Sequence, residues 1–208
     1  FAGPQSVTNA TYGNLTLSGS GLKTIGTSTV VGILSMEGTA TATGTPTYGA
    51  SSTLQYAGSA AQIAGGEMPA TFNGSGGVII NNPTGITFYS TYTISSTLTM
   101  SSGDIAMGTN TLILSNSSGN AIIYTSGIIT GKIRRAISTV TSTNYLFPVG
   151  VTGSYRPAMF NFSAISATTN ITAEFIPTSP TGFTGYADGS STLDYLFTEG
   201  YWRFISSG

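Results

Sequence analysis

The residues that could do chemistry in this chain are few. The 208-residue sequence has no histidine and no cysteine, which excludes a catalytic triad built on histidine, a zinc finger and a thiolate metal site. Six Lys and Arg residues face seven Asp and Glu residues, for a net charge of −1. Such a chain has no electrostatic attraction for nucleic acid, so we expect no nucleic-acid partner.

Three acidic residues in the first half of the chain are the candidates for a carboxylate pair. Glycosidases hold two carboxylates about 5 to 9.5 Å apart across the scissile bond. Glu37, Glu67 and Asp104 lie far apart in the sequence, and no repeat relates one to another. We interpret them as solvated turn residues and expect neither enzymatic activity nor a cofactor.

A second acidic group lies near the end of the chain. Asp188 and Asp194 bracket a Gly-Ser-Ser-Thr-Leu segment, with Glu199 close by, and together they could offer oxygen ligands to Ca²⁺. The segment lacks the dense Asp and Asn alternation of an EF-hand loop, and a polar turn explains it equally well. Asp188 and Asp194 are therefore a weak calcium candidate.

Three of the basic residues cluster at Lys132, Arg134 and Arg135. In a strand, Lys132 and Arg134 share one face, whereas Arg135 points to the other face with its apolar neighbours. An arginine directed inward needs a partner, and the sequence predicts a structural ion pair between Arg135 and Glu174.

The composition indicates which elements must hold these residues. The chain has 28 Gly, 28 Ser and 35 Thr, and its hydrophobic residues make up 39% of the total. The apolar runs are far shorter than the roughly 18 residues that a membrane helix needs, so we expect no membrane insertion. Short runs of β-branched and aromatic residues between Gly, Asn and Ser predict an all-β protein with many tight turns.

An internal repeat is the strongest signal in the sequence. An offset of about 64 residues relates two sets of apolar residues that we expect to point into the core. The first set is Leu15, Leu22, Val30, Leu34 and Met36, and the second is Ile79, Ile86, Ile94, Leu98 and Met100. Within each repeat, apolar clusters recur after about 20 residues, so that Met100 is equivalent to Ile80 and Leu114 is equivalent to Ile94. This rhythm predicts a short β-solenoid of right-handed type over residues 15–131. A β-sandwich over residues 12–130 is the alternative.

The pattern changes after residue 131. Longer runs such as residues 158–162, 171–175 and 201–204 alternate between two faces, as antiparallel strands do. We expect residues 132–208 to form a β-sandwich-like domain that is incomplete alone. Residues 1–14 are expected to be an N-terminal strand or linker that could take part in assembly.

Several sequence segments resemble those of a known group of proteins. The sequences of residues 54–69, 78–86 and 108–114 resemble repeats of large secreted surface proteins of Bacteroidota-type bacteria. The Gly-Lys-Ile-Arg-Arg segment at 131–135, with 147–150 and 155–157, resembles a module that often follows those repeats. The resemblance covers roughly residues 54–160. It implies secretion to the extracellular space or cell surface and a structural or adhesive role, and it transfers no catalytic residues.

We therefore expect a non-enzymatic structural subunit that polymerises head to tail with copies of itself. An uncharged N-terminal strand and an unfinished C-terminal sheet are unlike surfaces, and joining unlike surfaces propagates without closing. The expected assembly residues are Val7, Tyr12, Tyr201, Trp202 and Phe204.

The alternative is a monomeric cell-surface adhesin or glycan-binding stalk, whose partners would be surface glycans or other cells. A sugar-stacking platform could then be formed by Tyr145, Tyr155, Tyr186, Tyr195, Tyr201 and Trp202.

Overall fold

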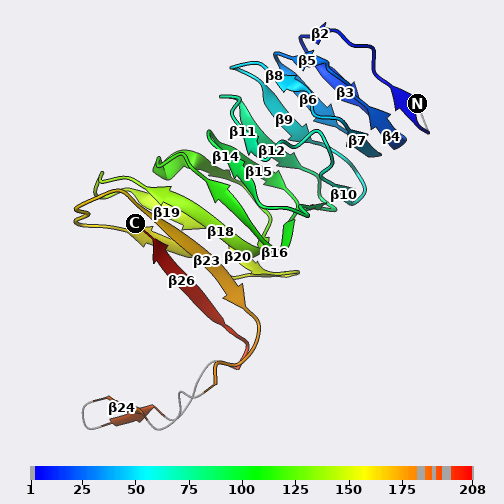
Figure 1. Ribbon diagram of the computed structural model, residues 1–208. Helices are drawn as coiled ribbons and strands as arrows, with labels where there is room; N and C mark the ends of the chain where they lie inside the picture. The colour runs from blue at the N-terminus through cyan, green and yellow to red at the C-terminus, as the bar shows by residue number, and fades with distance from the viewer. Residues whose placement is uncertain (1–2, 182–185, 189–190, 194–197, 208) are drawn as a thin grey trace.

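The protein is an elongated stack of coils followed by a small antiparallel sheet (Figure 1). The computed structural model describes residues 3–181, 186–188, 191–193 and 198–207. Strands of one coil pair in parallel with their counterparts in the next coil, which makes a β-solenoid of about seven turns. This parallel pairing confirms the predicted solenoid and rules out the β-sandwich alternative for residues 12–130. The described residues contain no helix with the length and hydrophobicity that a membrane crossing requires.

The strands of the solenoid fall into three ranks along its axis. The first rank contains β1 (Gln5–Ser6), β4 (Ser20–Thr24), β7 (Thr39–Thr43), β10 (Gln62–Ile63), β13 (Ile86–Thr87), β16 (Ile105–Leu114) and β18 (Ile129–Ile137). The second contains β2 (Thr11–Tyr12), β5 (Thr29–Val30), β8 (Thr47–Tyr48), β11 (Thr71–Phe72) and β14 (Tyr92–Ile94), and the long strands β16 and β18 continue into it. The third contains β3 (Leu15–Leu17), β6 (Ile33–Met36), β9 (Thr53–Tyr56), β12 (Gly77–Asn81), β15 (Leu98–Ser102) and β17 (Ile122–Tyr124).

Apolar side chains fill the centre of the coils. One column is formed by successive strand partners at intervals of 19 to 24 residues, namely Leu15, Leu34, Leu54, Val78, Leu98 and Ile122. Ile80 pairs with Met100 and Ile94 pairs with Leu114, and all four are buried, which confirms the predicted coil length. The expectation for Ile79 was wrong: it alternates with the buried Ile80, so it faces outward and is only half-buried.

The expectation that Leu22 of the second coil points inward was also wrong. Leu22 is 45% exposed, whereas its neighbour Lys23 is buried. The Lys23 ammonium donates to the Gly3 carbonyl at 2.9 Å, to Gln5 Oε1 at 2.9 Å and to the Ser20 carbonyl at 3.0 Å. These oxygen partners offset the desolvation of the charge, so the strand can turn its lysine inward and its leucine outward.

The N-terminal segment is the first coil rather than a separate strand or linker. β1 pairs with β4, β2 pairs with β5, and the Val7 amide donates to the Thr24 carbonyl at 2.8 Å. One edge of the strands before residue 15 therefore already bonds to the second coil.

The small antiparallel sheet continues the solenoid instead of starting a separate unit. β18 stacks in parallel on β16 and pairs antiparallel with β23 (Thr169–Ile176), which pairs with β26 (Tyr201–Ser207). The expected boundary after residue 131 falls inside β18. The remaining elements are β19 (Asn144–Phe147), β20 (Val149–Val151), β21 (Ser154–Tyr155), β22 (Ala158–Asn161), the hairpin of β24 (Tyr186–Asp188) and β25 (Ser191–Leu193), and a 3-10 turn η1 (Gly119–Ala121).

Candidate functional site

The last strand, β26, is exposed over most of its length. Among the described residues it pairs with β23 alone, so its second edge carries no ladder partner there. Trp202 and Phe204 are each 41% exposed and Ile205 is 52% exposed. Natural sheet proteins usually protect such an edge with charge, proline or a covering element, because it is a template for another strand. This strand offers open backbone groups and apolar side chains together.

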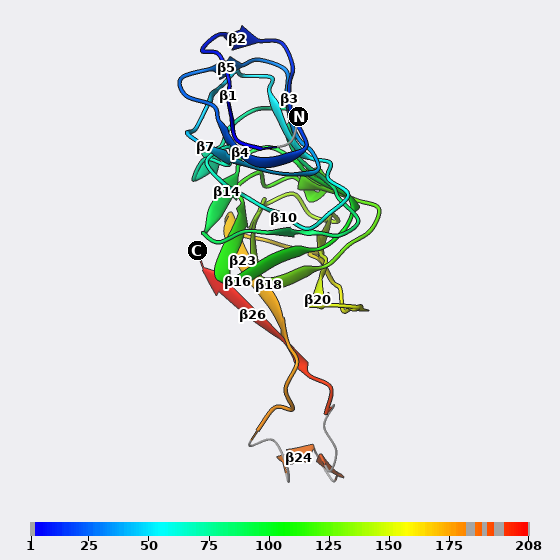
Figure 2. The ribbon, with the colours of Figure 1, turned by 90° about the vertical axis from the view of Figure 1, so that its right-hand side faces the viewer.

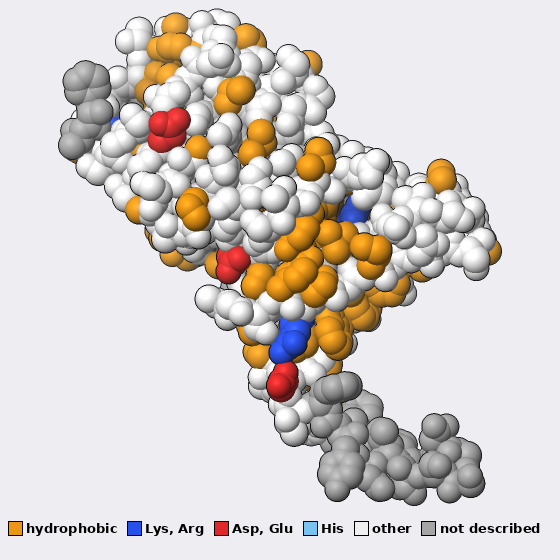
Figure 3. Space-filling model, turned by 180° about the vertical axis from the view of Figure 1, so that it is seen from behind, with side chains coloured by type: hydrophobic (Ala, Val, Ile, Leu, Met, Phe, Trp, Pro, Cys, Tyr) orange, Lys and Arg blue, Asp and Glu red, His pale blue; other side chains and the backbone are white. Residues whose placement is uncertain are grey.

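An aromatic surface adjoins this edge, made of Phe160, Phe162, Trp202 and Phe204; we call it the aromatic face. Phe204 lies opposite the buried Ala173 of β23, so it points toward the core side of the sheet. Its ring meets Phe160 of β22 edge to face at 4.8 Å, and Phe160 stacks on Phe162 at 5.9 Å. Figure 3 shows hydrophobic side chains gathered over this part of the molecule.

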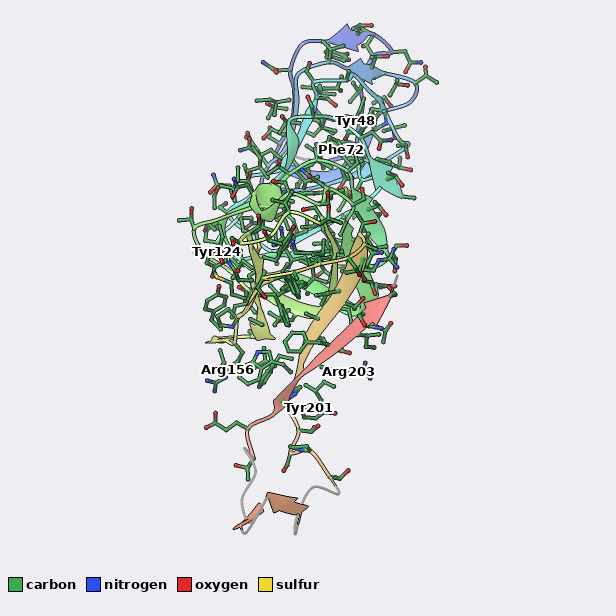
Figure 4. The ribbon with its side chains drawn as sticks, turned by 90° about the vertical axis from the view of Figure 1, so that its left-hand side faces the viewer. Tyr48, Phe72, Tyr124, Arg156, Tyr201 and Arg203 are labelled. Atoms are coloured by element: carbon green, nitrogen blue, oxygen red, sulfur yellow. The ribbon has the colours of Figure 1, made fainter. Side chains whose placement is uncertain are left out.

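Charges around the aromatic face are neutralised in pairs. Arg156 donates to Glu199 at 2.7 Å beside this face, and Arg203 bonds to Glu174 on the other face of the same two strands. Trp202 Nε1 donates to the Arg156 carbonyl at 2.9 Å, which fixes the indole beside the first ion pair. Figure 4 shows Arg156, Tyr201 and Arg203 together at this end of the molecule. The surface therefore presents little net charge to a partner.

A small hollow of about 120 Å³ lies between these groups. It is lined by Arg156, Phe175, Glu199, Gly200 and Trp202. The Phe175 and Trp202 rings meet edge to face at 5.3 Å, and the Arg156 guanidinium lies 6.0 Å from the Phe175 ring centre. The hollow therefore adjoins the aromatic face, with which it shares Trp202.

The opposite end of the solenoid carries a second opening. The strands β1, β2 and β3 of the first coil lie on three sides of the axis (Figure 2), and each pairs only with the second coil among the described residues. A cavity of about 250 Å³ opens here, lined by Gln5, Ser6, Val7, Leu15, Thr16, Leu17, Ser18 and Lys23.

The expected assembly residues are therefore divided between the two ends. Val7 lines the cavity and packs partly against the core, and Trp202 and Phe204 lie on the aromatic face. Tyr12 is half-buried and donates to the Thr8 carbonyl at 2.7 Å, and Tyr201 is half-buried on the other face of β26. Val7 follows β1 and Tyr12 ends β2, which pair with different strands of the second coil, so the two residues do not lie on one strand and cannot fill pockets as one added strand would.

The predicted ion pair between Arg135 and Glu174 is not formed. Arg135 lies opposite Ile171, whereas Glu174 has the other parity on β23 and faces away from it. Glu174 bonds instead to Arg203, which lies directly opposite on β26. The inward direction of Arg135 is confirmed, since its side chain is fully buried.

Backbone carbonyls replace the expected carboxylate around Arg135. Its guanidinium donates to the carbonyls of Leu146, Ser118 and Gly119 at 2.8, 2.9 and 3.0 Å. It also lies 5.3 Å from the ring centre of Tyr145. Burial lowers the pKa of Arg135 to about 10, so the group is still charged at neutral pH.

A buried carboxyl group inside the coils was not anticipated. Glu67 is fully buried, and its Oε1 accepts from the Tyr56 hydroxyl at 2.9 Å and from the Gly65 amide at 2.8 Å. Its Oε2 has no hydrogen-bond partner among the described residues. Burial raises the pKa of Glu67. Tyr48, which meets Phe72 edge to face at 4.8 Å (Figure 4), donates to the Glu67 carbonyl at 2.7 Å. The expectation that Glu67 is solvated was wrong.

The other acidic candidates each accept a hydrogen bond. Glu37 accepts from the Ser35 hydroxyl at 3.1 Å, and Asp104 accepts from the Ile128 amide at 2.8 Å. Within the described part of the chain, no three acidic side chains gather as a metal site would require. The backbone of Asp188 belongs to β24, but its side chain and the whole of Asp194 lie outside the described residues.

The sugar-stacking platform of the alternative hypothesis is not assembled as expected. Tyr145 is fully buried, and its hydroxyl donates to the Ser117 carbonyl at 3.1 Å. Tyr155 stacks on Tyr124 at 5.4 Å, a contact that joins β21 to the solenoid. The side chain of Tyr186 and all of Tyr195 lie outside the described residues.

Comparisons with known proteins give this chain no relative. No family model matches it, and neither characterised proteins nor solved structures contain a significant match. The β-solenoid fold is thus the part of the predicted resemblance that the structure supports.

Proposed function

We propose that the protein is a non-catalytic structural protein of the extracellular space or cell surface, whose copies join end to end into a filament or fibre. The observation that carries the proposal is β26, an edge strand with Trp202, Phe204 and Ile205 in solvent. An added strand on this edge would gain main-chain hydrogen bonds and bury apolar area.

The electrostatics of the chain favour association. Residues 3–103 contain only three charged side chains, and two of these, Lys23 and Glu67, are buried. Stable monomers normally rely on surface charge to oppose association. The outer surface of the first five coils carries hydroxyl groups in place of charges, so little repulsion opposes the close approach of two copies.

Negative-stain imaging of the chain at low and high concentration tests this function. We expect fibres at high concentration, and we expect Phe204→Lys to abolish them because it places a charge on the aromatic face. Val31→Lys is the matched control, since Val31 is 43% exposed but lies in the turn between β5 and β6, away from the aromatic face. Discrete single particles at every concentration would contradict the proposal and favour the monomeric adhesin.

A further inference from the structure

The basic side chains outside the core are concentrated on one surface. The chain has six basic residues, of which Lys23 and Arg135 are buried. Three of the other four lie on the C-terminal sheet, on the side opposite to the aromatic face; we call this side the basic face, and its cations are Lys132, Arg134 and Arg203. The fourth, Arg156, pairs with Glu199 beside the aromatic face. Figure 4 shows Arg156 and Arg203 on either side of β23 and β26.

Strand register brings the three cations of the basic face close together. β18 turns Lys132 and Arg134 outward, in alternation with buried neighbours. Arg134 lies opposite Thr172 of β23. Glu174 is two residues further along β23, on the same face, and lies opposite Arg203 of β26. At about 4.8 Å between strands and about 6.7 Å between alternate residues of a strand, the three Cα atoms lie within about 12 Å of one another.

The positive charge of the basic face is not balanced. Glu174 is the only acidic residue on β16, β18, β23 and β26, and it already bonds to Arg203. Among the described residues, Lys132 and Arg134 form no ion pair, and Arg134 Nε is buried without a hydrogen-bond partner. A buried donor without an acceptor is costly, and oxyanions are the strongest acceptors for a guanidinium. The arrangement is therefore suited to an anionic ligand.

Protection of a sheet edge does not account for these cations. Charged residues on an edge strand oppose pairing with another chain, and Arg203 on β26 fits that role. Lys132 and Arg134 belong to β18, which is an interior strand between β16 and β23. Because an interior strand has no open edge there, these two charges point to a ligand on the face of the sheet.

A row of threonine and isoleucine side chains crosses the solenoid to reach the basic face. It is formed by successive strand partners, which are Thr71, Thr93, Ile113, Arg134, Thr172 and Ile205. All six residues are half-buried or exposed. At about 4.8 Å per strand the row is about 24 Å long. Threonine hydroxyls can both donate to and accept from the hydroxyl groups of a sugar.

We propose that the basic face binds an acidic polysaccharide. Its carboxylate or sulfate groups bond to Lys132, Arg134 and Arg203, and its hydroxyl groups bond to the threonines of the row. Nucleic acid fits less well, because its binding relies on many phosphate contacts and this chain has a net charge of −1. The basic face is separate from the aromatic face, so the inference goes beyond the proposed function and does not depend on assembly.

Biolayer interferometry of the full chain on immobilised polysaccharides tests this inference. Alginate carries carboxylates and dextran sulfate carries sulfates, so the two surfaces distinguish the acidic groups, and neutral dextran is the blank. We expect at least one acidic polymer to bind and dextran not to bind. Arg134→Gln should weaken binding by about tenfold or more. Arg156→Gln removes the same charge from the other side of the sheet and should change binding by less than about twofold.

Glu174→Gln distinguishes a charge effect from a loss of folding. It removes the only carboxylate of the basic face and releases Arg203 from its ion pair. We therefore expect tighter binding, whereas damage to the sheet would weaken it. The thermal transition of each variant shows whether it is folded.

Three results would overturn the inference. They are no binding to either acidic polymer, equal weakening by Arg134→Gln and Arg156→Gln, and binding to double-stranded DNA that is as tight as to the polysaccharide. None of them bears on fibre formation, which is imaged without polysaccharide. Loss of fibres in that imaging would in turn leave the basic face unaffected.

Discussion

The Arg135 guanidinium donates to the Leu146 carbonyl at 2.8 Å, so a buried cation ties the last coil to β19. Two further bonds reach the carbonyls of Ser118 and Gly119. This arrangement joins β18 to β19 and to the start of η1, so it holds the β19–β22 pair against the last coils of the solenoid.

Removal of this cation should be costly. Arg135→Ala leaves three carbonyls without their donor, and a hydrogen bond to a charged group contributes about 1.5 to 3 kcal/mol. We expect the free energy of unfolding to fall by at least about 3 kcal/mol in urea titrations. Lys132→Ala on the same strand is the control and should change it by less than about 1 kcal/mol. Equal losses for the two variants would show that Arg135 is not the joining group.

The apolar column makes a second prediction. Leu98→Asp places a carboxylate among the buried side chains of the neighbouring coils, and we expect a loss of about 4 kcal/mol or more. Thr99→Asp, one residue further along β15 and facing outward, should cost less than about 1 kcal/mol. Thermal unfolding followed by circular dichroism measures both. An unchanged melting temperature for Leu98→Asp means that the assigned column is wrong.

Stability should depend on pH through Glu67. Burial raises the pKa of this carboxyl group in the folded state, so the folded protein holds its proton to higher pH than the unfolded chain. The folded protein is then favoured at low pH, and stability falls as pH rises from the unfolded value through the folded pKa. The surrounding Tyr48 and Tyr56 have pKa values raised above their ordinary range and do not titrate in this window.

The variant Glu67→Gln isolates this effect. The introduced amide keeps an oxygen that can accept from the Tyr56 hydroxyl and the Gly65 amide, but it does not ionise. We expect the urea midpoint of the unmodified protein to fall as the pH is raised from about 4.5 to about 8, and that of the variant to fall by clearly less. Parallel pH profiles would exclude Glu67 as the source.

Folding should be independent of metal ions. The calcium candidates in the sequence are Asp188 and Asp194, which lack the ligand density of an EF-hand loop. We expect the melting temperature to be unchanged by a chelator. A fall that calcium reverses, and that disappears in Asp188→Asn with Asp194→Asn, would establish a calcium site there.

The coil length and most of the apolar core could be predicted from the sequence. The spacing from Ile80 to Met100 is visible because each coil repeats the same inward positions, and parallel stacking requires this repetition. Inward and outward positions are harder to assign in β4, because its lysine Lys23 faces inward and its leucine Leu22 faces outward. The oxygen partners of Lys23 include groups of the first coil that only the fold brings close.

The ion pairs depend on register, which composition cannot reveal. Glu174 could have met a basic residue of either neighbouring strand, because β23 lies between β18 and β26. The observed register places Arg203 opposite Glu174 and Ile171 opposite Arg135. The aromatic residues of the last strand could be read from the sequence. The cavity of the first coil could not, because it exists only once residues 5–18 have closed into a coil.

Sedimentation velocity of the unmodified chain over a wide concentration range tests the central claim most directly. End-to-end assembly predicts that the average sedimentation coefficient rises continuously with concentration, with frictional ratios that increase as the species lengthen. A single monomer boundary at every concentration, or one that stops at a dimer, would contradict it.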